Sequence, residues 1–205
     1  QLNQYHQYLK QRYAQLADKQ QQRQKTLARL NASINNKDQQ LKQLAQDRAH
    51  LEHLLQEVIE VTAGWQPQDN SQPFAKLRGK LPWPTKGAIV HSFGSSRSAG
   101  KMKWNGVMIN ASQGAEVTAI HRGQVVFADY LRGHGLLMIV DHGDNYMSLY
   151  AHNQALYKTT GDRVKAGEVI ANVGNSGGLA RAGLYFEIRF RGQPTNPAKW
   201  CRNNS

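Results

Sequence analysis

Five histidines beyond residue 80 are the side chains most able to bind a metal ion or move a proton near neutral pH. They are His91, His121, His134, His142 and His152. A zinc centre needs several such ligands together, and short spacings such as HxH or HxxxH often supply them. None of the five has a partner at either spacing. The pattern therefore predicts that His91, His121, His134 and His142 lie in turns or at the surface rather than in an assembled metal centre.

Short apolar segments separated by glycine-containing turns would position these residues. The strands that we expect are 88–93, 106–110, 116–120, 124–130, 136–141, 146–152, 168–173 and 184–191. No helical periodicity of useful length separates them. Many short strands at this spacing predict an all-β sandwich or a barrel-like pair of sheets.

Two of these strands are expected to show different chemistry on their two faces, because side chains alternate along a strand. The core face would carry Leu184, Phe186, Ile188 and Phe190 with Val107, Ile109 and Ala111. The opposite face would carry Gly183, Tyr185, Glu187 and Arg189 with Trp104, Gly106, Met108 and Asn110. The second face therefore combines aromatic, apolar and charged groups.

Residues 1–62 follow a different pattern, with no Gly or Pro and many Gln, Lys, Ala and Leu. These residues favour a long helix. Eight of ten heptad positions are apolar, which predicts a coiled coil. The ten are Leu27, Leu30, Ile34, Lys37, Leu41, Leu44, Arg48, Leu51, Leu55 and Val58. Polar stretches at 19–25 and 31–38 are weak points, and at 19–25 we expect a helix end or register shift. A solvated spacer helix stays open, but the leucine stripe favours a packing partner inside or outside this protein.

Turn-forming residues separate the two patterns. They are Gly64, Pro67, Asn70, Ser71 and Pro73, followed by Pro82 and Pro84. We therefore expect an α+β chain with a coiled-coil segment at 1–62, a linker with a regulatory role at 63–80 and a β domain at 81–205.

The charge balance limits the classes of partner. The chain carries 26 Lys and Arg against 14 Asp and Glu, a net charge of +12. This surplus favours nucleic acid, membrane surfaces, acidic protein faces or anionic wall polymer. Nucleic acid is disfavoured because neither a basic helix with interleaved aromatics nor a zinc-finger spacing occurs. The single cysteine, Cys201, allows no internal disulfide and no Cys-based metal site.

The sequence lacks a run of about 18 apolar residues, so we expect no membrane-spanning segment. It also shows no signal peptide and starts inside a patterned segment. We therefore expect a fragment whose true start is missing.

Ordered motifs beyond residue 83 resemble the LytM, or M23, family of zinc peptidases that cut bacterial cell walls. They include FG at 93–94, DHG at 141–143, LYAH at 149–152, FEIR at 186–189 and NPAKW at 196–200. The resemblance covers about residues 83–200. It implies the β fold of that family.

The same resemblance implies that the metal site has been lost. Active members hold zinc with an HxGxD motif and the second His of an HxH motif. Trp104 and Met108 stand at the first two ligand positions, Tyr185 at the third and Gly183 at the position of a helper histidine; only the helper His152 survives. Indole and thioether groups do not replace zinc ligands, and without zinc no hydroxide forms at neutral pH. We therefore expect no catalytic residue, no metal and no cofactor.

In place of the metal site we expect a groove that binds a protein or peptide partner. Trp, Tyr and Arg dominate binding hot spots, and Met adapts to varied apolar surfaces. The residues that we assign to the groove are Lys101, Lys103, Trp104, Met108, Tyr150, His152, Gly183, Tyr185, Glu187 and Arg189. An amphipathic segment with a few acids would fit such a groove. Random drift of a decaying site is the alternative.

Together with the helical segment, the resemblance points to the non-catalytic activators of this family. It implies a periplasmic protein at the division site. The β domain would bind amidases of the AmiA/AmiB type, which cleave septal peptidoglycan during daughter-cell separation, and the coiled coil would bind the FtsEX transporter. The helix or the linker would cover the groove until a signal moves it. A divergent zinc endopeptidase and a simple peptidoglycan-binding module remain alternatives.

Overall fold

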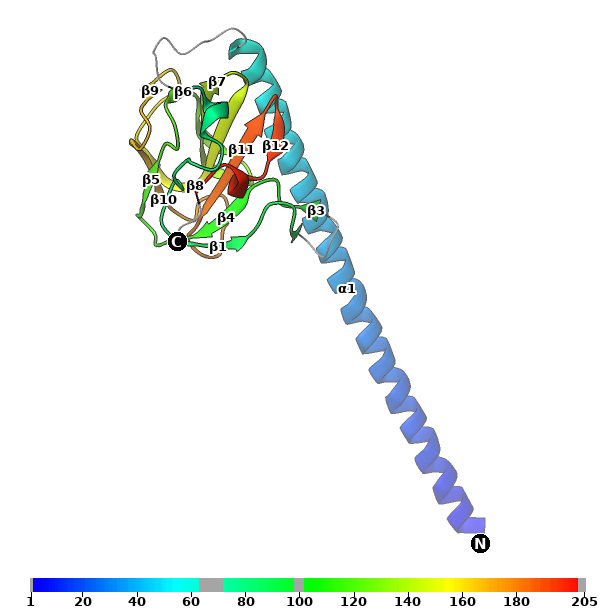
Figure 1. The fold of residues 1–205 in the computed structure, drawn as a ribbon. Helices are drawn as coiled ribbons and strands as arrows, with labels where there is room; N and C mark the ends of the chain where they lie inside the picture. Colours follow the sequence, from blue (N-terminus) through cyan, green and yellow to red (C-terminus); the bar gives the residue numbers. More distant parts are fainter. Residues whose placement is uncertain (1, 63–71, 98–101, 203–205) are drawn as a thin grey trace. The chain divides into compact units, whose positions relative to one another are not determined.

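The computed structural model describes residues 2–62, 72–97 and 102–202. One long helix, α1 (Leu2–Thr62), precedes a β-rich region (Figure 1). Contacts divide the chain into two compact units, residues 1–46 and residues 47–205. The last turns of α1 therefore belong to the same unit as the strands.

Helix α1 has no interruption in residues 2–62. Of the two alternatives expected within the polar stretch 19–25, the helix end is therefore wrong, and the register shift stays a prediction. The physical reason is that Gln, Lys and Arg have good intrinsic helix propensity, while Gly and Pro, which break helices, are absent. In the first unit Leu27, Leu30 and Ile34 are exposed, which is consistent with a coiled-coil surface.

The β region contains a ten-stranded antiparallel sheet and a separate two-stranded one, β2–β3. Its strands are β1 (Ala88–His91), β2 (Ser96–Arg97), β3 (Met102–Lys103), β4 (Val107–Asn110), β5 (Glu116–Thr118), β6 (Gly123–Leu131), β7 (Gly135–Gly143), β8 (Tyr146–Leu156), β9 (Arg163–Val164), β10 (Val169–Val173), β11 (Leu184–Phe190) and β12 (Gln193–Thr195). The main order is β1-β4-β11-β8-β7-β6-β9, with β10 bridging β5 and β8 and β12 pairing with β11. Each predicted strand overlaps an observed one, although β6, β7 and β8 extend beyond the predicted bounds, and the missed strands β2, β3, β9 and β12 are only two or three residues long.

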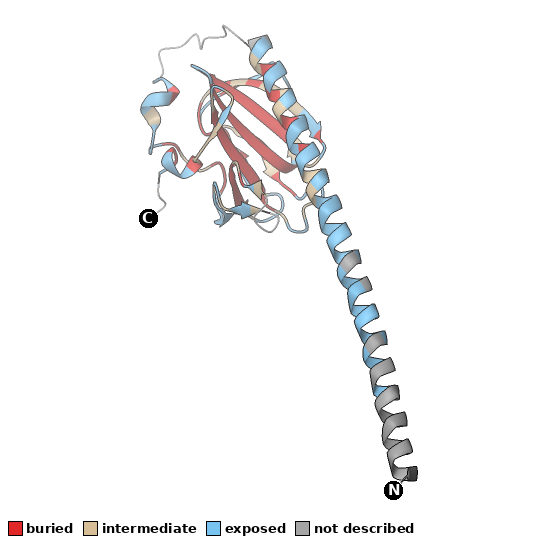
Figure 2. Ribbon diagram, turned by 90° about the vertical axis from the view of Figure 1, so that its right-hand side faces the viewer, coloured by how far each residue is buried: buried red, intermediate tan, exposed pale blue. Residues whose placement is uncertain are grey.

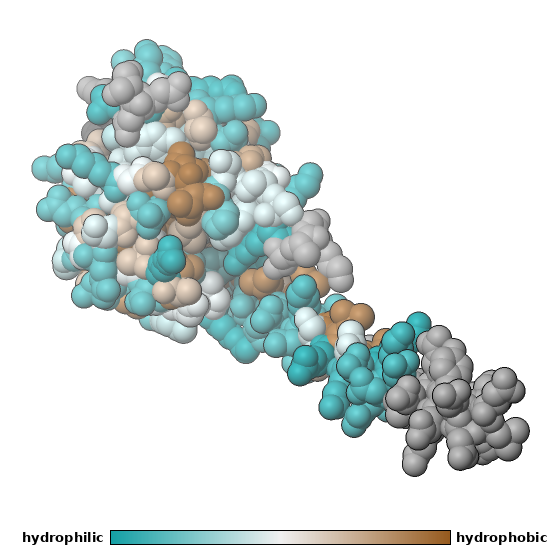
Figure 3. Space-filling model, turned by 90° about the horizontal axis from the view of Figure 1, so that it is seen from below, coloured by the Kyte–Doolittle hydropathy of each residue, from teal (hydrophilic) through white to brown (hydrophobic). Residues whose placement is uncertain are grey.

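Two apolar clusters lie on opposite faces of the central strands. The first cluster includes Val107, Ile109, Leu184, Phe186 and Ile188. The second cluster includes Met108 and Tyr185 from the same strands, together with Trp104, which directly follows β3. This confirms the alternation expected for both strands. The surface seen in Figure 3 is mostly hydrophilic, with a compact hydrophobic patch on the β region.

Part of the predicted linker belongs to the folded domain. Residues 63–71 lie outside the described part of the chain, but a 3₁₀ helix, η1 (Phe74–Leu77), follows. Phe74 is buried in the first cluster and stacks on His142 and Tyr146 with ring centroids 4.9 and 4.8 Å apart. A second 3₁₀ helix, η2 (Pro197–Lys199), precedes the buried Cys201.

Candidate functional site: a sheet face covered by the end of α1

The face of the sheet opposite the first cluster carries most of the predicted groove residues. Here we call Trp104, Met108, Tyr185, Glu187 and Arg189 the covered face, because all five are buried. Met108 lies on β4, the three residues Tyr185, Glu187 and Arg189 lie on β11, and Trp104 directly follows β3. Tyr185 pairs with Met108 across β11 and β4, so the two side chains lie side by side on one face.

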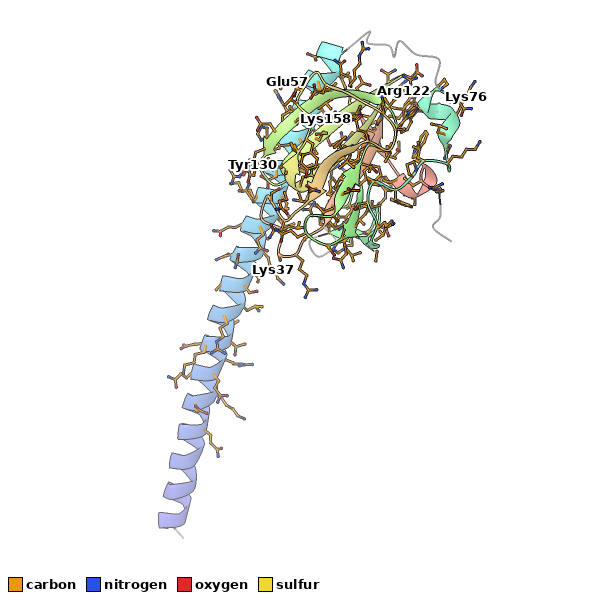
Figure 4. The ribbon with its side chains drawn as sticks, turned by 90° about the vertical axis from the view of Figure 1, so that its left-hand side faces the viewer. Lys37, Glu57, Lys76, Arg122, Tyr130 and Lys158 are labelled. Atoms are coloured by element: carbon orange, nitrogen blue, oxygen red, sulfur yellow. The ribbon has the colours of Figure 1, made fainter. Side chains whose placement is uncertain are left out.

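Residues 47–62 at the end of α1, which we call the covering segment, bury this face. Leu51, Leu55 and Val58 are buried in the second cluster with Trp104 and Tyr185. Their spacing places them on one side of the helix. Figure 2 shows this part of α1 lying over buried strands, and Figure 4 shows Glu57 on the segment's outer side. The part of the seam at 51–58 therefore packs inside this protein.

A chain of charged hydrogen bonds joins the covering segment to the sheet. The two terminal nitrogens of Arg189, Nη1 and Nη2, donate to the Glu52 oxygens Oε2 and Oε1, each at 2.7 Å. The Arg189 Nε donates to Glu187 at 2.5 Å, and the Tyr185 hydroxyl donates to Glu187 at 2.6 Å. Such bidentate pairs combine strength with a fixed geometry. Arg189 is only 1% exposed, so a partner for its charge is required wherever this face is closed.

Ionisation of this network follows from its contacts. The hydrogen bond from Arg189 lowers the pKa of Glu52, against the opposing effect of burial. Burial, together with the neighbouring Glu187, raises the pKa of Tyr185 well above its usual value. Glu52 is therefore an anion and Tyr185 a neutral donor at neutral pH.

Two histidines lie next to this network and remain neutral at neutral pH. The His152 Nδ1 donates to the Ser176 carbonyl oxygen at 2.8 Å, and the His152 backbone N–H donates to the His134 carbonyl oxygen at 2.8 Å. Burial lowers the pKa of His152, and burial with the nearby His152 lowers the pKa of His134 to about 4. Among the described residues, no group of three or more His, Cys, Asp or Glu side chains is arranged to hold a metal ion.

The remaining predicted groove residues differ in their surroundings. Lys101 lies outside the described residues, whereas Lys103 is exposed beside Trp104. Gly183 lies close to Met108, because a Cβ added there would be 3.4 Å from the Met108 sulfur and 3.0 Å from the Ile109 carbonyl oxygen.

The placement of Tyr150 in the groove is wrong. Its side chain lies in the first cluster, where its hydroxyl accepts hydrogen bonds from the Ile120 backbone N–H at 3.1 Å and the Ser148 hydroxyl at 2.9 Å. Alternation explains this, because its neighbours Leu149 and Ala151 occupy the second cluster.

Sequence reasoning missed several residues of the site. The Arg97 guanidinium lies 4.2 Å from the centre of the Trp104 ring, and the His91 ring stacks on the Trp104 ring with the two centroids 4.8 Å apart. Nothing in the sequence connects Arg97 with Trp104. For Leu51, Leu55 and Val58 the heptad pattern signalled burial without identifying the partner.

The sequence and the fold are similar to those of known proteins. Residues 102–197 match the model of peptidase family M23. Over 123 residues the chain is 47% identical to the murein hydrolase activator EnvC of Escherichia coli K12, a match covering 60% of this chain and 29% of that protein. Identity to the murein hydrolase activator NlpD of the same organism is 40% over 119 residues, covering 58% of this chain and 30% of that protein. These matches span less than a third of each relative's length.

Solved structures agree on the fold. Csd3 of Helicobacter pylori superposes with a TM-score of 0.53 at 26% identity, over 60% of this chain and 35% of that one. A zinc-containing peptidase from Vibrio cholerae gives a TM-score of 0.55 at 24% identity, over 60% of this chain and 40% of that one. The β-rich region thus has the fold of M23 peptidases, and its sequence is similar to those of the murein hydrolase activators EnvC and NlpD.

Proposed function

We propose that this chain is a non-catalytic activator of periplasmic N-acetylmuramoyl-L-alanine amidases of the AmiA/AmiB type. The observation that carries this proposal is the covered face. Trp104, Met108 and Tyr185 stand where the M23 resemblance places zinc ligands, and the same face holds an amphipathic helix. Because the covered face packs against a helix of its own chain, it is suited to a partner that presents a helix. The names of the relatives EnvC and NlpD support an activating role.

The chemistry of the face supports a binding role rather than bond cleavage. Tyr185 is held by Glu187, and Trp104 offers no lone pair to a metal. His152 uses one ring nitrogen to bond Ser176, which leaves a single imidazole nitrogen for a metal or a water molecule. One such group does not bring bound water near a pKa of 7. The hydrolytic zinc would then belong to the amidase.

The covering segment would make this activity switchable. An amidase that needs the covered face competes with Leu51, Leu55 and Val58 for it. The closed form would therefore be inactive, and a signal that moves α1 would release the face. In this proposal the signal comes from the FtsEX transporter at the division site, through the helical segment, and the result is septal peptidoglycan cleavage.

The test uses the whole chain with a purified amidase and wall sacculi, and follows the release of soluble wall fragments. A variant with Leu55→Asp opens the face by placing a charge in the second cluster. We expect it to stimulate the amidase, and Leu55→Asp combined with Tyr185→Ala not to do so. Circular dichroism should show the same strand content for both variants.

The other readings predict distinct results in the same assay. Fragment release without amidase, with stoichiometric zinc, would indicate a divergent endopeptidase. Sacculus binding by the opened variant without amidase stimulation would indicate a peptidoglycan-binding module. Either result would overturn the proposal.

A further inference from the structure

A cavity lies away from the covered face. Its volume is about 430 Å³, within the range of small-ligand sites. It is lined by Pro82, Trp83, Pro84, Thr85, Lys86, Ala115, Glu116, Thr118 and Arg202. Trp83 packs against the first cluster, on the opposite side of the sheet from Trp104 and Tyr185. A ligand here would leave the covered face free.

The frame of this cavity is preformed. The Pro84 carbonyl oxygen accepts hydrogen bonds from the Thr118 backbone N–H at 2.8 Å and from its hydroxyl at 3.2 Å. The Trp83 indole N–H donates to the Arg202 carbonyl oxygen at 3.1 Å, and the Arg202 N–H donates to the Leu81 carbonyl oxygen at 2.9 Å. These bonds join three separate segments of the chain. A preformed site loses little conformational freedom when a ligand binds.

The charged side chains around the cavity indicate which groups a ligand would need to carry. Lys86, Glu116 and Arg202 are exposed, and within the described part of the chain their side chains form no ion pair. Two cations and one anion beside an apolar floor of Trp and Pro complement a group with two carboxylates and one ammonium. Lys76, Arg122 and Lys158, labelled in Figure 4, lie elsewhere on the domain, and Lys158 forms an ion pair with Glu168 at 2.6 Å.

We propose that this cavity binds a peptide end that carries two carboxylates and one ammonium. A terminal diaminopimelate residue on the stem peptide of the cell wall has this set of groups. Lys86 and Arg202 would bind the carboxylates, Glu116 the ammonium, and Trp83 the aliphatic chain. The identification of the cell wall as the source of this peptide rests on the proposed function. The charge complementarity between the cavity and the peptide end is independent of that function. Binding wall and amidase on opposite faces would raise the effective concentration of the enzyme at its substrate.

Isothermal titration calorimetry with the whole chain tests this site. The probe is the N-acetylated stem tripeptide ending in diaminopimelate, and the matched probe ends in lysine, which lacks one carboxylate. We expect saturable binding of the first probe and at least about tenfold weaker binding of the second. Lys86→Glu with Arg202→Glu should abolish binding, whereas Arg163→Glu with Lys165→Glu, an equal change of charge elsewhere on the surface, should not.

Further readouts separate this site from the amidase role. Trp83→Ala would also remove a packing contact with Phe186. The variant with Lys86→Glu and Arg202→Glu is therefore the decisive one, and Trp83→Ala gives only supporting evidence. In the Leu55→Asp background, the Lys86 and Arg202 variant should still stimulate an amidase on a soluble substrate, but should bind sacculi less. Absence of saturable tripeptide binding, or equal binding by the two double variants, would overturn the cavity proposal whatever the amidase result.

Discussion

Replacing Leu55 with alanine tests directly whether the covering segment restrains the protein. Leu55 is 1% exposed and packs in the second cluster with Trp104 and Tyr185. Removing a buried leucine side chain costs about 2–5 kcal/mol. The cost falls only on the closed form, because in the open form residue 55 is solvated on a helix whether it is Leu or Ala. A shift of about 2.7 kcal/mol raises the open-to-closed ratio about a hundredfold.

The assay is amidase stimulation measured against the concentration of the activator. If opening limits binding, the concentration needed for half-maximal stimulation should fall in inverse proportion as the open fraction rises. Leu27→Ala is the matched control, since Leu27 lies on the same helix but is 57% exposed. Equal stimulation by the wild type, Leu55→Ala and Leu27→Ala, with folded protein in each case, would refute the idea that the covering segment competes with the partner.

Three other perturbations have defined outcomes. Glu52→Gln removes the charge that Arg189 binds in the closed form, so half-maximal stimulation should need about tenfold less activator; an unchanged titration curve would contradict the role of this pair. Phe186→Ala, at a fully buried position, should lower the free energy of unfolding by about 3–5 kcal/mol in urea titrations, and a loss below about 1 kcal/mol would contradict its burial. Burial lowers the pKa of His134 to about 4 and of His142 to about 3, below the ordinary value of 6.5. The unfolded chain therefore binds more protons than the folded one below pH 6.5, so stability should be full above this pH and fall towards pH 4, by up to about 1.4 kcal/mol per pH unit for each histidine; an equal urea midpoint at pH 7 and pH 5 would contradict this.

Local rules were enough to predict most of the fold from the sequence. Alternation placed Tyr185 and Met108 on one face and Phe186 and Ile109 on the other, because a strand side chain has only two directions to point. The absence of Gly and Pro predicted the helix, and its continuity through the polar stretch agrees with the good helix propensity of Gln, Lys and Arg. The identities of Trp104, Met108 and Tyr185 were likewise visible in the sequence, where they already argued against a zinc site.

Only the tertiary structure determined what those residues contact. Glu52 and Arg189 are 137 positions apart, and no periodicity relates a helix position to a strand that far along the chain. The heptad pattern showed that Leu51, Leu55 and Val58 need burial, but apolar burial is non-directional and does not specify a partner. In the structure the partner is the covered face of the sheet, so the groove side chains Trp104, Met108 and Tyr185 are buried beneath the covering segment. Tyr150 was misplaced because the choice between two faces depends on the strand's register with its neighbours, and pairing across the sheet sets that register.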